Sequence, residues 1–433
     1  MSQQHFATRI TTILTMVGIA MGLGNVWRFP YMMGKYGGSA FLAVYLLLTV
    51  LFAIPAMMAE STLGQMSGKG TVDALRMSLG KKAGSFFGWM LMVVISIAGS
   101  YYAVIVGNVV FTAAFSVFPG FSDTTQSLYQ SNLGLPWLQY VVTMAVVALC
   151  LYIIHRGVAK GIELLSRRVV PLFFLTLTYM IVHALTLPGA IDKCLEFLKP
   201  DLSVMGFPEV FAALGQAFFS VGLGGTFVVV YAGFLRKEED IPMISMFTGF
   251  GDVFSSLLFA VFLIPSILVF GLDMTSGPNL IFNTLPHLFA VMPGGWLVGT
   301  FFLMSISIVG LLSLVAAYQV PFTSVINEWP TLNKGKILLT IGMAQAILVL
   351  PSCFFPSIIG PLDMIFGSGM QVFGSVLCIL ALTWGVKRGL VMQRMFKTGP
   401  ESSFRKMVYF WIKWIIPLAL LSVLLGYLYD VIL

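Results

Sequence analysis

Long apolar stretches dominate this chain and limit what it can fold into. About eleven segments of roughly 20 or more mostly apolar residues follow one another, separated by short polar breaks. Of the 433 residues, 58% are hydrophobic and only 9% are charged, whereas roughly 25% of the residues in a soluble domain carry charge. A helix of about 20 apolar residues spans the core of a lipid bilayer. We therefore expect an all-α membrane protein that crosses the bilayer many times.

The apolar segments follow each other so closely that we expect a single transmembrane domain over residues 1–433, with no separate soluble domain. The predicted helices cover residues 9–35, 40–66, 84–117, 136–155, 162–186, 206–234, 240–271, 296–326, 334–352, 362–386 and 406–430.

Basic residues, which give the chain its formal net charge of +7, concentrate on alternate connections between these helices. Runs such as Lys81–Lys82, Arg167–Arg168 and Lys387–Lys406 fall on one side. The few on the other side are Arg28, Lys35, Lys193 and Lys199. By the positive-inside rule, this pattern predicts a cytoplasmic N-terminus and an external C-terminus in the inner membrane of a cell. The charge then reflects membrane topology, and nucleic-acid binding is not indicated.

Glycine-rich runs interrupt two of the predicted helices, at residues 18–25 and 220–226. Glycine weakens a helix by about 1 kcal/mol relative to alanine, and unpaired backbone groups are not tolerated against lipid. Such runs can also serve close helix packing. At matching places five helices apart, they favour an inverted repeat around a central site. The repeats would be helices 1–5 at 9–186 and helices 6–10 at 206–386, followed by an extra helix at 406–430.

Four motifs carry a resemblance to a known family. They are Gly22–Pro30 (GLGNVWRFP), Lys35–Gly38 (KYGG), Arg156–Glu163 (RGVAKGIE) and Gly215–Ser220 (GQAFFS). Together they resemble the neurotransmitter:sodium symporter family, whose motifs they follow in order and spacing nearly from end to end. The resemblance implies a leucine-transporter-like fold with about eleven helices, a form common among bacterial amino-acid transporters.

Broken helices suit a zwitterionic substrate. The start of a half-helix presents unpaired N–H groups that attract a carboxylate, and the end of a half-helix presents carbonyls that attract a cation. We expect N–H groups near Leu23 and Gly24 to bind the carboxylate of an amino acid. Carbonyls near Ala20, Phe219 and Ser220 would bind its ammonium group.

Two further residues narrow the substrate class. The resemblance places Tyr102 where the family has a tyrosine hydroxyl directed at the carboxylate, although an aromatic ring at this place can also pack between helices. Gly22 stands where amine-transporting relatives have an aspartate. The missing aspartate argues for an amino acid rather than a biogenic amine.

The resemblance also implies which residues surround the substrate side chain: Ala98, Phe219, Gly222, Gly225, Ser313 and Ala317. Most of them are small, and the leucine-selective bacterial relative has bulkier groups at several of these positions. Burial of apolar surface contributes about 25 cal/mol per Å². We therefore predict a large neutral amino acid, with tryptophan, tyrosine or phenylalanine ahead of alanine or glycine.

A first sodium site is implied by the same resemblance. Its oxygen ligands would come from Ala20, Asn25, Ser220, Asp252 and the substrate carboxylate, and oxygen ligands suit a hard cation. Asp252 is one of few carboxylates in the predicted helices, where such groups are costly and usually functional. Its charge would replace the chloride ion of animal relatives. We therefore expect chloride-independent transport, with Ser256 near the chloride position.

A second sodium site matches the family only in part. It would use the carbonyls of Gly18, Met21 and Val309 and the side chains of two neighbours, Leu312 and Ser313. Leu312 has no oxygen atom to offer. Either the site is weakened, or the alignment is shifted, or transport is coupled to fewer sodium ions.

The outer gate implied by the resemblance is an ion pair between Arg28 and Asp363, with Gln216 nearby. An arginine in this setting needs a partner because a buried unpaired charge is costly. Tyr102 and Phe219 would form a lid beneath it.

The inner gate departs from the family. The family's ion pair and its tryptophan fall here on uncharged residues, namely Gln3, Asn327 and Phe6. A neutral amide pair would hold the inner gate less strongly than an ion pair.

These features predict a sodium-coupled symporter that imports a neutral amino acid by alternating access. A channel would need repeated pore loops or charged rings, and the sequence has neither. Paired acids or a nucleophile with its base, as an enzyme requires, are missing too. The departure at Leu312 keeps an alternative open, a sodium-independent or proton-coupled amino-acid transporter of the same fold.

Overall fold

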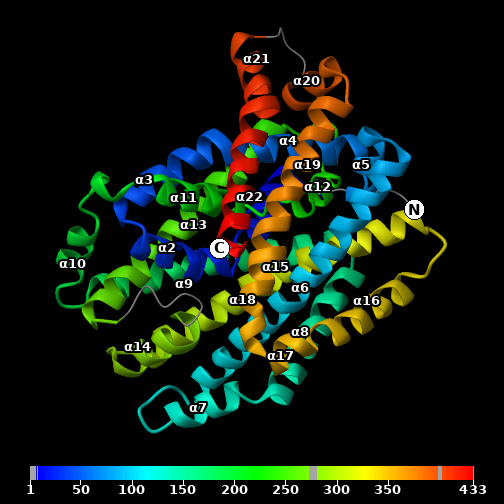
Figure 1. The fold of residues 1–433 in the computed structure, drawn as a ribbon. Coiled ribbons are helices and arrows are strands. Elements are labelled where there is room, and N and C mark those ends of the chain that lie inside the picture. The colour runs from blue at the N-terminus through cyan, green and yellow to red at the C-terminus, as the bar shows by residue number, and fades with distance from the viewer. Residues whose placement is uncertain (1–5, 7, 273–279, 398–401, 433) are drawn as a thin grey trace.

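Helices make up nearly all of the structure. This computed structural model describes the chain apart from residues 1–5, 7, 273–279, 398–401 and 433 (Figure 1). Within the described residues there is no β-strand. In the same part of the chain, nine continuous helices are long and apolar enough to cross a membrane, and a bent pair of helices at the N-terminus makes a tenth span. The chain is therefore an all-helical, multi-pass membrane protein.

Several continuous spans contain π-helical or 3-10 turns, labelled η, between regular segments. The spans are built from α3 (Ser39–Leu48), η2 (Thr49–Ala53) and α4 (Ile54–Ser67); α6 (Lys81–Val117); α8 (Pro136–His155); η3 (Val158–Glu163) and α9 (Leu164–Leu185); α13 (Ile241–Val269); α15 (Gly295–Glu328); α16 (Lys334–Leu348) and α17 (Leu350–Phe354); η6 (Pro356–Ile358), α18 (Ile359–Leu362), η7 (Asp363–Gly369) and α19 (Met370–Gly385); and α21 (Ser403–Phe410), η8 (Trp411–Ile415) and α22 (Ile416–Ile432).

The predicted helix ends differ from the observed ones where a span begins with polar residues. The third predicted helix begins at Lys81 rather than at 84, directly after Gly80, whose φ of +82° turns the chain. The last predicted helix begins at Ser403 rather than at 406, with the Ser402 side chain capping it. A search for apolar residues misses such first turns because their side chains face water.

Short helices in the connections were not predicted. They are α5 (Thr71–Leu79), α7 (Gln126–Leu133), α10 (Ala190–Phe197), η4 (Leu202–Val204), η5 (Leu280–Thr284), α14 (Leu285–Val291) and α20 (Arg388–Phe396). In Figure 1, α10 lies at the left, α14 at the lower left and α7 at the bottom, whereas α5 and α20 lie toward the upper right. These helices therefore cover the two opposite ends of the transmembrane bundle.

The first span is bent by 69° at its glycine-rich run. Here α1 (Arg9–Ala20) ends, and η1 (Gly24–Arg28) leads into α2 (Phe29–Lys35). The Gly22 N–H donates to the side-chain oxygen of Asn25 at 3.0 Å. The Asn25 side chain thus supplies a hydrogen-bond partner for a backbone N–H group that loses its helical partner at the break. Such a partner is required in apolar surroundings.

The second glycine-rich run separates α11 (Phe207–Ser220) from α12 (Phe227–Ala232), which have 14 and 6 residues and are each too short to span a membrane alone. The fully buried carboxylate of Glu60, in α4, accepts the N–H groups of Gly224 at 3.2 Å and Gly225 at 3.1 Å. A side chain from a neighbouring span therefore replaces the hydrogen bonds that a continuous helix would make.

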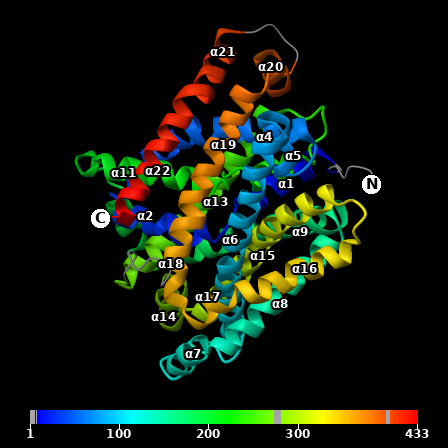
Figure 2. The ribbon, with the colours of Figure 1, turned by 45° about the vertical axis from the view of Figure 1, so that its right-hand side comes forward.

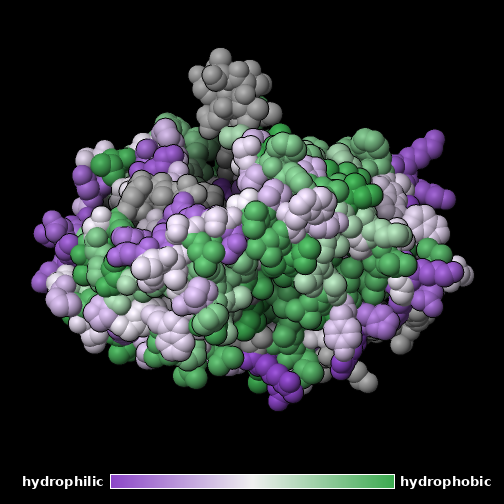
Figure 3. Space-filling model, turned by 90° about the horizontal axis from the view of Figure 1, so that it is seen from below, coloured by the Kyte–Doolittle hydropathy of each residue, from purple (hydrophilic) through white to green (hydrophobic). Residues whose placement is uncertain are grey.

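The helices α6 and α15 lie side by side through the middle of the molecule (Figures 1 and 2). Both pass the two breaks and supply one wall of the space between them. In the view of Figure 3, hydrophobic residues gather mainly in the middle of the surface, and hydrophilic residues gather toward its left and right margins. This distribution suits a protein whose middle belt contacts lipid.

Candidate substrate and ion site

A cavity lies between the two helix breaks, α6 and α15. The predicted substrate-contact residues that line it are Ala20, Leu23, Gly24, Ala98, Tyr102, Phe219, Ser220, Gly222, Ser313 and Ala317. Gly225 does not line it, because this residue packs against Cys378 and Gly374 of α19. The structure thus brings all but one of the predicted contact residues to one place.

Main-chain groups of the first break face the hydroxyl of Tyr102. The Leu23 N–H donates to Tyr102 Oη at 3.4 Å. A Cβ at Gly22 would lie 3.4 Å from Ser313 Oγ and 3.7 Å from Tyr102 Oη, so Gly22 faces the same part of the cavity. N–H groups at the start of a half-helix, together with a hydroxyl donor, suit an anion. This edge of the cavity is therefore suited to a carboxylate.

A buried polar cluster around Asp252 of α13 adjoins the cavity. The Asn25 amide donates to Asp252 Oδ1 at 2.6 Å and to Ser256 Oγ at 2.8 Å. The Ser220 hydroxyl donates to Asp252 Oδ2 at 2.6 Å. The side chains are buried, with Ser220 the most exposed at 4%. The cluster joins η1, α11 and α13 at the point where the two glycine-rich helix breaks meet.

In the part of the chain that the structure describes, no cationic side chain forms an ion pair with Asp252. Ion pairs between described residues include Arg76–Glu328 and Arg236–Glu239, neither of which involves Asp252. Burial of a carboxylate without a counter-charge is costly. Carboxylate, hydroxyl and main-chain oxygens are the ligands that hard cations prefer. The donor set and the uncompensated charge of this cluster therefore fit a small metal cation such as sodium.

At the second predicted sodium site, the contacts establish which residues of α15 face the break. Ser313 Oγ donates to the Met21 carbonyl at 2.8 Å and lies 3.4 Å from the Val309 carbonyl. Leu312 is buried, and its Cδ1 lies 3.7 Å from the position that a Cβ of Gly18 would take. The expected neighbours are thus together, but an apolar group stands where a further oxygen would be needed.

Of the predicted outer-gate residues, Asp363 lines the cavity, and Arg28 and Asp363 do not form the expected ion pair. The guanidinium carbon of Arg28 lies 4.1 Å from the centroid of the Phe219 ring. Asp363 instead accepts a hydrogen bond from the Tyr101 hydroxyl at 3.1 Å. Both amide atoms of Gln216 and one guanidinium nitrogen of Arg28 are buried without a hydrogen-bond partner among the described residues. A cation–π contact takes the place of the ion pair in this structure.

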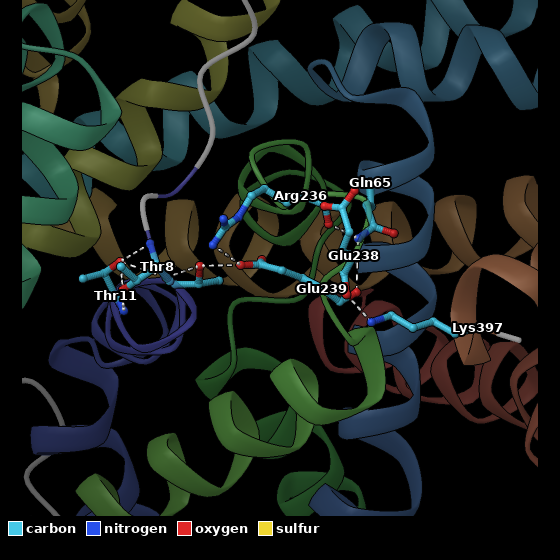
Figure 4. Close-up of polar contacts among 8 residues, drawn as sticks. Thr8, Thr11, Gln65, Arg236, Glu238, Glu239 and Lys397 are labelled. Carbon is cyan, nitrogen blue, oxygen red and sulfur yellow. Dashed lines mark hydrogen bonds and ion pairs between the residues drawn. The ribbon is translucent and has the colours of Figure 1, made fainter.

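On the face where α1 begins, a polar cluster ties this helix to the connection between α12 and α13 (Figure 4). The Thr12 hydroxyl donates to Glu239 Oε1 at 3.1 Å, and the Arg236 guanidinium lies 3.8 Å from the same oxygen. Gln65, near the end of α4, donates to the Arg236 carbonyl at 2.8 Å. This N-terminal cluster links three segments that are far apart in the sequence.

Of the three predicted inner-gate positions, Phe6 and Asn327 are among the described residues. Gln3 is outside the described residues, and Asn327 lies in the last turn of α15. Phe6 donates its N–H to the Phe234 carbonyl at 3.3 Å, and the two rings pack edge to face with centroids 6.1 Å apart. The charges that hold α1 here therefore come from the connection after α12, which the sequence analysis did not single out.

Glu60 and several cavity residues were also missed. Glu60 is a carboxylate within an apolar segment, and the same signal that singled out Asp252 could have found it. The remaining missed residues line the cavity from neighbouring helices: Ile19, Ile95, Gly99, Tyr101, Phe227, Gly367 and Gln371. No sequence signal marks these residues, because their positions depend on how α6, α12 and α19 pack together.

Comparison with known proteins adds independent evidence. The model of the sodium:neurotransmitter symporter family matches residues 3–126 and 125–431. The chain is 27% identical to an uncharacterized sodium-dependent transporter of Haemophilus influenzae, over 99% of this chain and 98% of that protein. It is 26% identical to the uncharacterized sodium-dependent transporter YhdH of Bacillus subtilis, over 98% of each chain.

Among solved structures, the crystal structure of MhsT in complex with L-phenylalanine is similar over the whole chain. The TM-score is 0.88 at 26% sequence identity, and the match covers 98% of this chain and 100% of MhsT. An all-helical fold with two broken helices around a cavity, together with the family match, identifies a membrane transporter, not an enzyme. The chain belongs to the sodium:neurotransmitter symporter family and is a sodium-dependent transporter.

Proposed function

We propose that this protein imports a large neutral amino acid together with sodium by alternating access. The observation that supports the proposal is the cavity, one edge of which suits a carboxylate and adjoins the buried cluster around Asp252. Leu23 and Tyr102 form that edge, while Asn25 and Ser220 bond to Asp252. A substrate carboxylate bound there would complete the oxygen ligands of a sodium ion in the first site, so that each favours binding of the other.

The rest of the cavity favours a bulky substrate side chain. Ala98, Gly222 and Ala317 leave space, while Ile95 and Phe227 supply apolar surface. Apolar burial contributes about 25 cal/mol per Å², so phenylalanine, tyrosine and tryptophan gain most in such a space. MhsT, a relative of similar structure, was crystallised with phenylalanine, which supports an aromatic substrate.

Asp252 also supports transport without chloride. Its carboxylate is held by Asn25 and Ser220, beside the hydroxyl of Ser256. A fixed negative charge at this place does what a bound chloride ion does in animal relatives, since either balances the sodium ion in a medium of low dielectric constant.

For the topology we propose a cytoplasmic N-terminus and an external C-terminus in the inner membrane, from the alternation of basic connections. With α11 and α12 counted as one broken span, the chain has about eleven spans, as such inverted-repeat transporters do. Segments 9–186 and 206–386 are then the two repeats, and α21, η8 and α22 form an additional helix.

Competition binding to the purified protein tests the proposed substrate. We expect phenylalanine, tyrosine and tryptophan to displace radiolabelled phenylalanine in sodium but not in potassium, with or without chloride. Glycine and alanine should bind about tenfold more weakly or worse, because they leave the apolar space unfilled. Glycine or alanine as the tightest ligand would contradict the substrate class. Phenylalanine binding that depends on pH but not on the sodium concentration would favour the proton-coupled alternative.

A further inference from the structure

The side chain of Leu312 fills space next to the point where α1 opens. Leu312 is 2% exposed, and its Cδ1 lies 3.7 Å from the position of a Cβ on Gly18. A hard cation needs oxygen atoms around it. A methyl group supplies none and keeps water from taking their place, so this side of the second predicted sodium site cannot contribute to binding.

The oxygens that remain at this place already bond to each other. The Ser313 hydroxyl donates to the Met21 carbonyl at 2.8 Å, with the Val309 carbonyl 3.4 Å away. A buried carbonyl that accepts such a hydrogen bond is satisfied by the protein. None of these groups carries charge, so nothing here demands a cation.

The cluster around Asp252 differs because it contains a charged group. It holds a buried carboxylate with no cationic side chain beside it among the described residues, and this carboxylate accepts hydrogen bonds from the Asn25 amide and the Ser220 hydroxyl. We propose that this transporter binds and moves one sodium ion with each substrate, at the Asp252 cluster, and that Leu312 is the residue that removes the second ion. This inference rests on the sodium-coupled function proposed above.

One nearby hydroxyl offers a rival arrangement. Ser166 of α9 is fully buried, has no hydrogen-bond partner among the described residues, and lies 3.8 Å from the same Cβ position on Gly18. A Ser166 hydroxyl that replaced the missing ligand would restore a second ion. The experiment therefore includes Ser166→Ala.

Equilibrium binding of radiolabelled sodium to the purified protein counts the ions directly. In the presence of phenylalanine we expect one ion per protein in the wild type and in Ser166→Ala. Leu312→Thr returns a hydroxyl to the site and should raise the count to two. Leu311→Thr makes the same change one residue away, where the side chain points elsewhere on α15, and should leave the count at one.

Two ions in the wild type would overturn the proposal, and a fall to one in Ser166→Ala would then identify the compensating ligand. One ion in Leu312→Thr would show that Leu312 does not set the number, which also overturns it. Leu312→Ser supplies a second variant with the same expectation, so that poor folding of one variant does not end the test.

A flux measurement in proteoliposomes gives the number of charges moved per substrate. Sodium is set equal on both sides, and phenylalanine is tenfold higher inside. Net flux of phenylalanine then stops at a membrane potential of about 59 mV if one charge moves with each substrate, and at about 30 mV if two charges move. We expect the wild type near the first value and Leu312→Thr near the second. A wild type that balances near the second value would contradict single-ion coupling. Absence of any sodium-driven flux would instead contradict the proposed function, while the binding count would still stand as a separate result.

Discussion

At the scale of single residues, Asp252 combines burial, charge and contact with both broken helices. Its two carboxylate oxygens accept hydrogen bonds from Asn25 on one side and Ser220 on the other, both at 2.6 Å. Either residue adjoins the cavity as well. In the proposed site, a change in charge at Asp252 would therefore alter binding of the sodium ion and, through it, binding of the substrate.

Asp252→Asn keeps the shape of this side chain and removes its charge. Hydrogen bonds to charged groups are worth about 1.5–3 kcal/mol, so we expect sodium-dependent phenylalanine uptake to fall about ten- to hundredfold at a fixed sodium concentration. Replacement of chloride by gluconate should leave the wild type unchanged and should lower the residual uptake of the variant. A wild type that needs chloride, with a variant that does not, would contradict the role of Asp252.

Gly22 tests the carboxylate-binding edge. A Cβ there meets Ser313 Oγ at 3.4 Å and Tyr102 Oη at 3.7 Å, which are ordinary contact distances, so a side chain fits. We expect Gly22→Asp to weaken phenylalanine binding about tenfold or more, since two carboxylates repel and the hydrogen bonds are lost. The variant should gain binding of phenethylamine, which lacks the carboxylate. Gly22→Asn has nearly the same shape without the charge, and an equal loss in both variants would contradict a charge effect.

At the scale of elements, the N-terminal cluster decides how firmly α1 is held against the rest of the bundle. It ties α1 through Thr12 to Glu239, and Glu239 is paired with Arg236. Because this face would be the inner one in the proposed topology, opening toward the cytoplasm requires these contacts to part. We propose that the cluster takes over the role that the resemblance assigns to an ion pair at the positions of Gln3 and Asn327.

Glu239→Gln should loosen α1. Loss of one contact worth about 1 kcal/mol raises the population in which the start of α1 is detached roughly fivefold. Backbone amides in the first turns of α1 should therefore exchange hydrogen for deuterium about fivefold faster, as measured by mass spectrometry. Glu238→Gln is the matched control, because the contact of Glu238 with Lys397 is made by its backbone carbonyl. Equal exchange in both variants would contradict the role of Glu239.

The helix breaks could be predicted from the sequence, but their internal geometry could not. Glycine density and the cost of open backbone in lipid locate both breaks. Gly222 and Gly225 come from the same run, yet one lines the cavity and the other packs against α19. Their φ values of +69° and +70° belong to neither a helix nor a strand. No periodicity therefore tells which of them faces the substrate.

At the scale of the whole molecule, side chains that meet across several helices escape sequence reasoning. Arg28 and Asp363 form a plausible pair by charge, but the ring of Phe219 and the hydroxyl of Tyr101 take their places as partners. Leu312 is different, because the sequence alone reveals that this side chain has no oxygen atom for an ion. The structure adds that the side chain lies next to Gly18.

Topology is the remaining property of the whole molecule that the account predicts. In a variant with Cys194 changed to serine, we expect a membrane-impermeant maleimide to label Ser131→Cys, an exposed position in α7, on intact cells. Gln393→Cys, exposed in α20, should be labelled only after the cells are permeabilised. The reverse pattern would contradict a cytoplasmic N-terminus.

The central claim is that a sodium gradient drives uptake of a large neutral amino acid, and proteoliposomes test it most directly. With purified protein, radiolabelled phenylalanine should accumulate under an inward sodium gradient. It should not accumulate when potassium replaces sodium, even under an inward proton gradient. Accumulation under the proton gradient alone, or equal uptake in sodium and potassium, would contradict the account.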